Sequence, residues 1–175
     1  TTGTVLVTNA VTIYGNHEQL MAALVTESTK AVIRNANVMI NDADATAITA
    51  AELAAIGAAT TGTVLVTNAV SIIGATAQVI AALVTEGTVT VANDSLVTIT
   101  DNPTIAELNA ITAKTSGIVT ATLSANSLAN LAALTTAGSD LITITVNDAD
   151  ATAITASELS AIGGKTAGTV TVTNA

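Results

Sequence analysis

The 175-residue sequence contains no cysteine, no tryptophan and no phenylalanine, and Tyr14 is its single aromatic residue. Without cysteine, the chain can form neither a disulfide nor a thiolate metal site. With so few aromatic side chains, the hydrophobic core must consist of valine, isoleucine, leucine and alanine. Such small and uniform side chains suit layers that stack on one another better than they suit a ligand pocket, which is usually lined with bulkier groups.

Basic residues are also scarce, since 4 lysines and arginines stand against 13 aspartates and glutamates, giving a net charge of −9. The four basic residues form no continuous stripe, and nucleic acid is not an expected partner because phosphate neutralisation needs clustered lysine and arginine. No apolar run reaches the length of about 18 residues that indicates a transmembrane helix. No charged-then-apolar leader opens the chain either, so we expect no membrane span.

A short phrase that recurs along the chain is the most informative feature of the sequence. Residues 3–10 match residues 62–69 at every position, and residues 168–175 differ from them only by Thr171 in place of leucine. Weaker copies begin at Gly87, Gly117 and Gly138. Internal repeats of about 27 residues are typical of solenoid architectures. The predicted units of this single array are 3–29, 30–61, 62–86, 87–116, 117–137 and 138–167, with a closing strand at 168–175.

Each unit combines a strand pattern with a helix pattern. Residues 141–146 alternate between aliphatic side chains and threonine, which predicts strands with valine and isoleucine inward and threonine outward. Thr49, Thr104 and Thr155 are each followed three residues later by glutamate, which is the capping box of a helix start. Further helices are predicted at 16–25, 76–86 and 124–136. Because helical crossovers join parallel strands, we predict a parallel β-helix-like β-solenoid with short α-helices in its coils.

Neither end of this array carries a polar cap, since Val5 and Val7 open the chain and Val170 and Val172 close it. A terminal unit cannot bury its own apolar face, and repeat arrays therefore need capping units. We expect either a segment of a longer array or a subunit whose open end is covered by another copy.

Two turns rich in aspartate are the best candidates for a ligand site. Residues 41–46 read Asn-Asp-Ala-Asp-Ala-Thr, and residues 147–152 repeat them. Ca²⁺ takes six to eight oxygen ligands, and the candidate calcium ligands are Asp42, Asp44, Asp148 and Asp150. Alternatively, these side chains bond their own backbone and place negative charge near a helix N-terminus. No motif for any other cofactor is present.

Outward threonines give a second candidate surface. Thr63 and Thr67, with their equivalents in other units, would form a hydroxyl grid that resembles the ice-contacting faces of some antifreeze solenoids. Threonine is also a good solvent-facing strand residue, which explains the same pattern without a ligand. The alternative to a structural role is therefore a binding module for calcium, ice or a carbohydrate surface.

Catalysis is not expected. His17 is the single histidine, and in the first turn of a predicted helix we interpret it as a solvated surface residue. Nothing near it in the sequence supplies an orienting partner together with a nucleophile elbow. We predict that the chain is not an enzyme.

Three phrases carry a resemblance to a known group of proteins. Thr-x-Gly-Thr-Val-x-Val-Thr, Val-x-Ile-x-Asp-x-x-Thr-Ile-x-Glu-Leu-x-Ala-Ile and Ala-Ala-Leu are similar to the Thr/Ala/Val-rich repeat arrays of bacterial, notably cyanobacterial, surface and secreted giant proteins. This resemblance implies an extracellular or cell-surface location and a spacer or adhesive role. We therefore expect a structural repeat of an extracellular fibre, filament, adhesin or surface layer, which associates end to end with itself and contacts a surface glycan or matrix partner.

Overall fold

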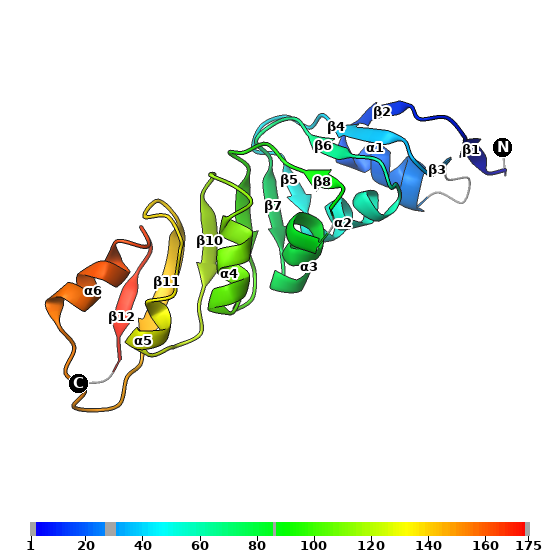
Figure 1. The fold of residues 1–175 in the computed structure, drawn as a ribbon. Helices are drawn as coiled ribbons and strands as arrows, with labels where there is room; N and C mark the ends of the chain where they lie inside the picture. The colour runs from blue at the N-terminus through cyan, green and yellow to red at the C-terminus, as the bar shows by residue number, and fades with distance from the viewer. Residues whose placement is uncertain (1–2, 27–30, 86, 174–175) are drawn as a thin grey trace.

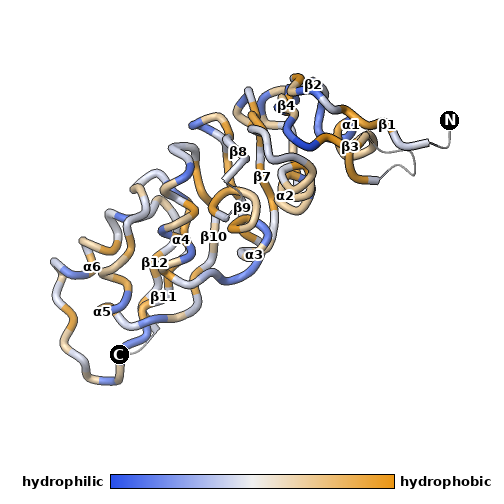
Figure 2. Tube along the Cα trace, turned by 45° about the vertical axis from the view of Figure 1, so that its right-hand side comes forward, coloured by the Kyte–Doolittle hydropathy of each residue, from blue (hydrophilic) through white to orange (hydrophobic). Residues whose placement is uncertain are grey.

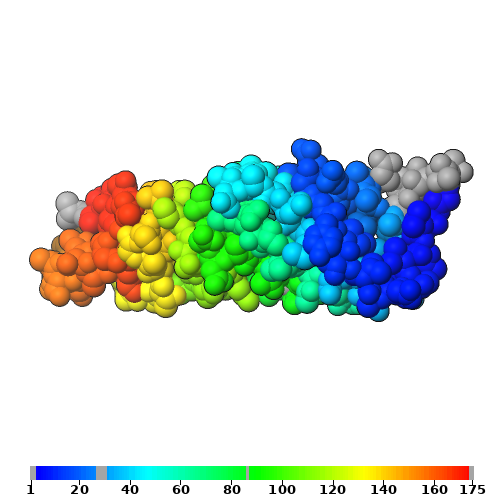
Figure 3. Space-filling model, turned by 90° about the horizontal axis from the view of Figure 1, so that it is seen from above, coloured from blue at the N-terminus to red at the C-terminus, as the bar shows by residue number. Residues whose placement is uncertain are grey.

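The fold is an elongated α/β body, seen in a computed structural model that describes residues 3–26, 31–85 and 87–173. The two ends of the chain lie at opposite ends of this body (Figure 1), and the space-filling view shows the sequence progressing along it from one end to the other (Figure 3). In the described residues, no helix has both the length and the apolar character needed to span a bilayer.

Strands and helices alternate along most of the chain. The strands are β1 (Val5–Val7), β2 (Thr12–Gly15), β3 (Ala31–Ile33), β4 (Asn37–Ile40), β5 (Ala47–Thr49), β6 (Val64–Val66), β7 (Ser71–Gly74), β8 (Val89–Thr90), β9 (Leu96–Ile99), β10 (Val119–Thr122), β11 (Leu141–Val146) and β12 (Val170–Val172). The helices are α1 (His17–Met21), α2 (Ala50–Ala58), α3 (Thr76–Ile80), α4 (Ile105–Thr112), α5 (Leu128–Leu131) and α6 (Ala156–Gly163). Two π-helical turns, η1 (Ala22–Thr26) and η2 (Ala81–Thr85), extend α1 and α3.

The strands form three parallel sheets. The first contains β1 and β3, the second has the order β2-β4-β6-β8, and the third has the order β12-β11-β10-β9-β7-β5. Equivalent residues pair in register, as in Ile13↔Val38, and Ile72↔Val97. The strands are parallel because the chain crosses over through a helix or a loop before each return to a sheet.

The prediction of a β-solenoid, and of a filament-forming repeat built from such coils, is wrong. The chain is an α/β fold with sheets of two, four and six strands and six α-helices in its described part. A solenoid of equal coils requires every unit to supply the same strands, but residues 31–58 supply three strands whereas residues 117–137 supply one. The second sheet therefore ends at β8, while the third continues to β12 without it.

Helix starts follow the predicted capping boxes. Thr49, Thr104 and Thr155 are the N-caps of α2, α4 and α6, and in each case the threonine oxygen accepts from the N–H of the glutamate three residues later. The helix predicted over 124–136 is much shorter, since α5 covers Leu128–Leu131. The helix predicted over 76–86 forms as α3 and η2, with Glu86 outside the described residues.

The core is a continuous column of aliphatic side chains between the strands and the helices. Apolar and polar stretches alternate along the tube in Figure 2, in keeping with strands that bury one face. In β11, Ile142, Ile144 and Val146 are buried whereas Thr143 is exposed, which confirms the predicted inward and outward faces of this strand. Burial of this kind contributes about 25 cal/mol per Å² of apolar surface, and it is the main source of stability for a chain without disulfides.

A Thr-x-Gly motif ties consecutive segments together. The Thr60 hydroxyl donates to the carbonyl oxygen of Ala36 at 2.6 Å, and it accepts from the N–H of Gly62 at 3.0 Å. A Cβ atom on Gly62 would overlap the same carbonyl oxygen, so the close approach requires glycine. The same arrangement recurs at Thr115 with Gly117 and at Thr166 with Gly168.

Candidate functional site

The four aspartates singled out as calcium candidates lie in two equivalent turns. One turn precedes β5 and the other precedes α6, and they share a backbone conformation in which Ala45 and Ala151 both have φ of 61°. Figure 1 shows β5 and α6 well apart along the body. The structure therefore does not bring the two turns together into one site.

Asp42 faces the start of helix α1. Its Oδ2 accepts from the backbone N–H of His17 at 2.7 Å, and its Oδ1 lies 2.8 Å from Nδ1 of the same residue. The side chain of His17 is 12% exposed, and that of Asp42 is 6% exposed. The interpretation of His17 as a solvated surface residue is therefore wrong, because its imidazole is half-buried against a carboxylate from the following segment.

Asp148 and Asp101 contact helix starts in the same way. Oδ2 of Asp148 accepts from the N–H of Leu128 at 3.0 Å, at the first residue of α5. Oδ1 of Asp101 accepts from the hydroxyl of Thr76 at 2.5 Å and from its N–H at 2.7 Å, at the first residue of α3. These two bonds, the one from the hydroxyl first, hold the pKa of Asp101 below its ordinary value. A carboxylate at the electropositive end of a helix is stabilising.

The role of Asp101 was missed in the sequence. A usable signal existed, since Asp42 and Asp101 each follow a strand and each lie 25 residues after the helix start that they contact. The equivalent separation for Asp148 is 20 residues. This pattern becomes visible only when the position of each aspartate is measured from the helix start in the preceding unit, and not from residues of its own turn.

Neither turn assembles a metal centre from histidine or carboxylate side chains. Oδ1 of Asp44 accepts from the backbone N–H of Ala69 at 3.0 Å, and Asp150 is exposed. Across residues 3–26, 31–85 and 87–173, no three histidine, aspartate or glutamate side chains form a group that could hold a metal ion. Asp42, Asp44 and Asp148 accept from backbone N–H groups that lie 20 or 25 residues away, so the alternative that they bond their own local backbone does not describe these bonds.

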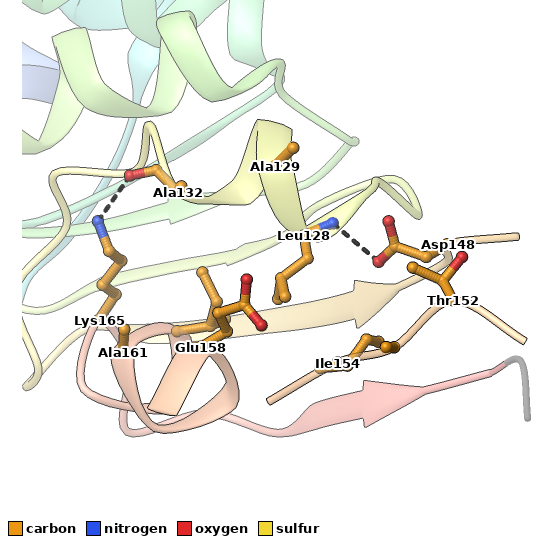
Figure 4. A pocket seen from close by; sticks show the side chains of 11 residues that line it. Leu128, Ala129, Ala132, Asp148, Thr152, Ile154, Glu158, Ala161 and Lys165 are labelled. Carbon is orange, nitrogen blue, oxygen red and sulfur yellow. Dashed lines mark hydrogen bonds between the residues drawn. The ribbon is translucent and has the colours of Figure 1, made fainter. Parts of the chain in front are cut away.

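A hollow of about 490 Å³ opens between α5 and α6. Figure 4 shows side chains from both helices and from the segment before α6 around it. Leu128, Ile154 and Ile162 supply apolar lining, and Asp148, Glu158 and Lys165 supply charged groups; the remaining lining residues are Ala129, Ala132, Thr152, Ala153 and Ala161.

Charged side chains around the hollow bond to the protein itself. Nζ of Lys165 donates to the carbonyl oxygen of Ala132 at 3.1 Å and also to that of Leu134. Oε2 of Glu158 accepts from the hydroxyl of Thr155 at 2.7 Å and from its N–H at 2.9 Å, and these bonds, the hydroxyl first, lower the pKa of Glu158. An acid at the start of α5 and an ammonium at its end match the polarity of a helix.

The hollow lies beside α5, a helix of 4 residues. At the equivalent place near the N-terminus, α1 continues into η1, which contributes the buried side chain of Leu24. After Leu131 the chain instead leaves the helical path and runs through a loop until β11 begins at Leu141.

Cysteine and histidine, two residue types that are common in catalytic sites, are absent from the lining of the hollow. The sequence has no cysteine, and its single histidine lies in α1, at the other end of the body from α5 and α6 (Figure 1). An activated nucleophile needs a base within hydrogen-bond reach, and the carboxylates of Asp148 and Glu158 already accept backbone N–H groups. The polar groups of this region hold neighbouring segments in place.

Comparison of the chain with models of protein families, with curated proteins and with solved structures gave no match in any of the three searches. The functional argument therefore depends on the residues and the geometry described above.

Proposed function

We propose that this chain is a non-enzymatic structural module of an extracellular or cell-surface protein, in which it acts as a spacer or adhesive element. The observation that carries the proposal is the arrangement of the chain along an elongated body with its two termini at opposite ends (Figure 3). A body of this form separates whatever is attached to its two ends, and parallel sheets within it resist lateral collapse because their strands are hydrogen-bonded along its length.

The use of polar side chains supports a structural role. Asp42, Asp101 and Asp148 bond to helix starts in the preceding segment, and Thr60 and Thr166 bond to carbonyl oxygens there. Enzymes instead keep polar groups in a cleft with perturbed proton affinities for their substrates. The extracellular location is supported by the resemblance of the repeated phrases to those of bacterial surface proteins.

The binding alternatives have less support from this geometry. The Thr67 hydroxyl donates to the carbonyl oxygen of Ile40 at 3.1 Å, and that of Thr63 donates to Oδ1 of Asn37 at 3.0 Å, so the proposed hydroxyl grid is partly turned toward the protein. Tyr14 is the single aromatic residue and lies in β2, outside the lining of the hollow. A sugar ring in the hollow would therefore find no aromatic face on which to stack.

Immunogold labelling of the producing cells tests the proposal. Antibody against this chain is expected to label intact cells at their surface, and mild protease treatment of intact cells is expected to remove the label. Label that is confined to the interior, and that survives protease until the cells are opened, would contradict the proposed role. A cytoplasmic protein in the same sections serves as the control for cell integrity.

A further inference from the structure

Two segments that are neighbours inside the body, residues 41–50 and 60–70, each have an identical copy near one end of the chain. Residues 1–11 are identical to residues 60–70, and residues 147–156 are identical to residues 41–50. Inside the body, residues 41–50 and 60–70 are in contact, since the N–H of Ala45 donates to the carbonyl oxygen of Ala69 at 2.8 Å. Elements within or after these residues are also in contact, because β5 pairs with β7 and α2 packs on α3 and η2. The corresponding residues 3–11 and 147–156 lie near opposite ends of the body (Figure 1).

Apolar side chains that are buried inside the body are exposed at its N-terminal end. Val64 and Val70 are 0% exposed, whereas their counterparts Val5 and Val11 are 55% and 39% exposed. Both copies are followed by equivalent strands, because β4 pairs with β2 as β9 pairs with β7. The difference in burial therefore comes from the segment that precedes β6 and β7, which is the side that β1 and β2 leave open.

Side chains at the C-terminal end show the complementary difference. Ala50 at the start of α2 is fully buried, whereas its counterpart Ala156 at the start of α6 is exposed. Ile48 is fully buried in β5, where it pairs with Ile72. Its counterpart Ile154 is half-buried and lies in a segment without a strand partner. The C-terminal end thus lacks the cover that β7 and α3 give to β5 and α2.

We propose that a second copy of this chain docks head to tail on these surfaces. We define the N-terminal face as Val11, β2 and α1, and the C-terminal face as residues 153–155 and α6. In the proposed junction, β2 of one copy pairs with residues 153–155 of the other as β7 pairs with β5, and α1 packs on α6 as α3 packs on α2. The occupant is specified because the internal interface has the same sequence at its central positions. This inference is independent of where the protein is located.

The contact between Ala50 and Gly74 shows how close this junction is. A Cβ atom on Gly74 would lie 2.9 Å from the Cβ of Ala50, which is closer than two such atoms can approach, so the contact has no room for a larger residue. The equivalent contact in the proposed junction joins Ala156 of one copy to Gly15 of the other. A large side chain at Ala156 would therefore block the junction.

In the proposed junction, β12 of one copy and β1 of the incoming copy would both occupy the strand position next to β11. β12 pairs with β11 through Ile144↔Val170 as β6 pairs with β4 through Val38↔Val64, and β1 of the incoming copy carries nearly the same sequence as β12. We assign the position to β12, because the adjacent Thr166 hydroxyl donates to the carbonyl oxygen of Ile142 at 2.8 Å and accepts from Gly168 at 2.8 Å. β1 of the incoming copy is then released from β3.

Two blocking variants and their mixture test the proposal by sedimentation velocity over a series of concentrations. Ala156→Trp blocks the C-terminal face, and Val11→Asp places a charge in the N-terminal face. Salt near physiological ionic strength screens repulsion between chains with a net charge of −9. The unmodified chain is expected to grow beyond a dimer as its concentration rises, because a head-to-tail contact does not close on itself. Each blocking variant alone is expected to remain monomeric.

The mixture of the two variants is expected to form a dimer and nothing larger. Ala156→Trp retains an intact N-terminal face and Val11→Asp retains an intact C-terminal face, so one productive junction remains. Matched controls are Ser157→Trp and Leu6→Asp. Their internal counterparts are Ala51 and Leu65, which remain exposed inside the body, so a change at these positions should leave the junction intact. Both controls are expected to associate like the unmodified chain, and circular dichroism verifies that all variants are folded.

Three results would overturn the proposal. The first is an unmodified chain that stays monomeric at every concentration. The second is association that the blocking variants and the controls affect equally. The third is a mixture of folded Ala156→Trp and Val11→Asp chains that forms no dimer.

Discussion

Asp42 holds His17 at both its backbone and its ring, with Oδ2 at 2.7 Å from the backbone nitrogen and Oδ1 at 2.8 Å from Nδ1. The two residues are 25 positions apart in the sequence and belong to consecutive segments of the body. The contact therefore joins two segments and completes the start of helix α1 at the same time.

Replacing this carboxylate is expected to weaken the fold. Asp42→Ala leaves a half-buried imidazole and a helix N–H without their acceptor, and we expect the free energy of unfolding to fall by about 1–3 kcal/mol. Urea denaturation followed by far-ultraviolet circular dichroism measures the change. Asp94→Asn, at an exposed position in a turn, is the control and is expected to change stability by less than about 0.5 kcal/mol. Equal stability of the two variants would show that the contact contributes nothing.

Glycine at position 62 is expected to be irreplaceable even by alanine. The added methyl group of Gly62→Ala would overlap the carbonyl oxygen of Ala36, and relieving that overlap must shift the backbone of one segment. We expect a loss of about 1–3 kcal/mol in the free energy of unfolding. Gly163→Ala, at the last residue of α6 with open space around its Cα, is expected to be neutral or stabilising by up to about 1 kcal/mol. Similar losses for both variants would refute the argument from close approach.

Acid is expected to destabilise the protein through its helix caps. The capping glutamates have pKa values below their ordinary value of 4.5. The main cause is the bond from the Thr49 hydroxyl for Glu52 and the bond from the Thr155 hydroxyl for Glu158. For Glu107 the main cause is the bond from the N–H of Thr104. Because the unfolded carboxyls keep the higher pKa, they take up protons first as the pH falls. The stabilisation is therefore complete well above pH 4.5 and is lost as the pH drops through the lowered values.

A variant with glutamine at these three glutamates tests that dependence. Glutamine can still accept from the N-cap but cannot titrate, so the variant should lose less stability than the unmodified chain between about pH 5 and pH 3. Urea midpoints measured across this range provide the comparison. Glu18→Gln is the control, because Glu18 takes no part in the three capping boxes formed by threonine and glutamate. Parallel curves for the triple variant and the unmodified chain would contradict the assignment.

Calcium is expected to leave the melting temperature unchanged. Asp42, Asp44 and Asp148 each accept at least one backbone N–H, and a ligand must bind the folded state preferentially to raise its melting temperature. Thermal melts in millimolar calcium, in magnesium and in chelator make the comparison. A rise that is specific to calcium and that disappears in Asp44→Asn with Asp150→Asn would instead identify these turns as a calcium site.

Local features were predictable from the sequence. Thr49, Thr104 and Thr155 lie at helix starts because a capping box depends on residues that are three positions apart. The inward side chains of β11 follow from period-two alternation for the same reason. Interactions between residues two to three positions apart are determined by a short stretch of the sequence and do not depend on the rest of the molecule.

Features that depend on distant segments were predicted poorly. The division into three sheets depends on how many strands each segment contributes. The two ends of α5 contact Asp148 and Lys165, which both follow it in the chain. The partner of His17 is 25 residues away, so its own surroundings in the sequence indicated solvent. The aspartates of residues 41–46 were recognised as special, but their acceptor role belongs to the preceding helix.

The direction of the aspartate contacts has a consequence for how the chain folds during synthesis. Asp42, Asp101 and Asp148 each bond to a helix that precedes them, by 25, 25 and 20 residues. On the ribosome, α1, α3 and α5 therefore emerge before the residues that complete their first turns. The first turns of these three helices gain this acceptor only after a further 25, 25 and 20 residues have been made.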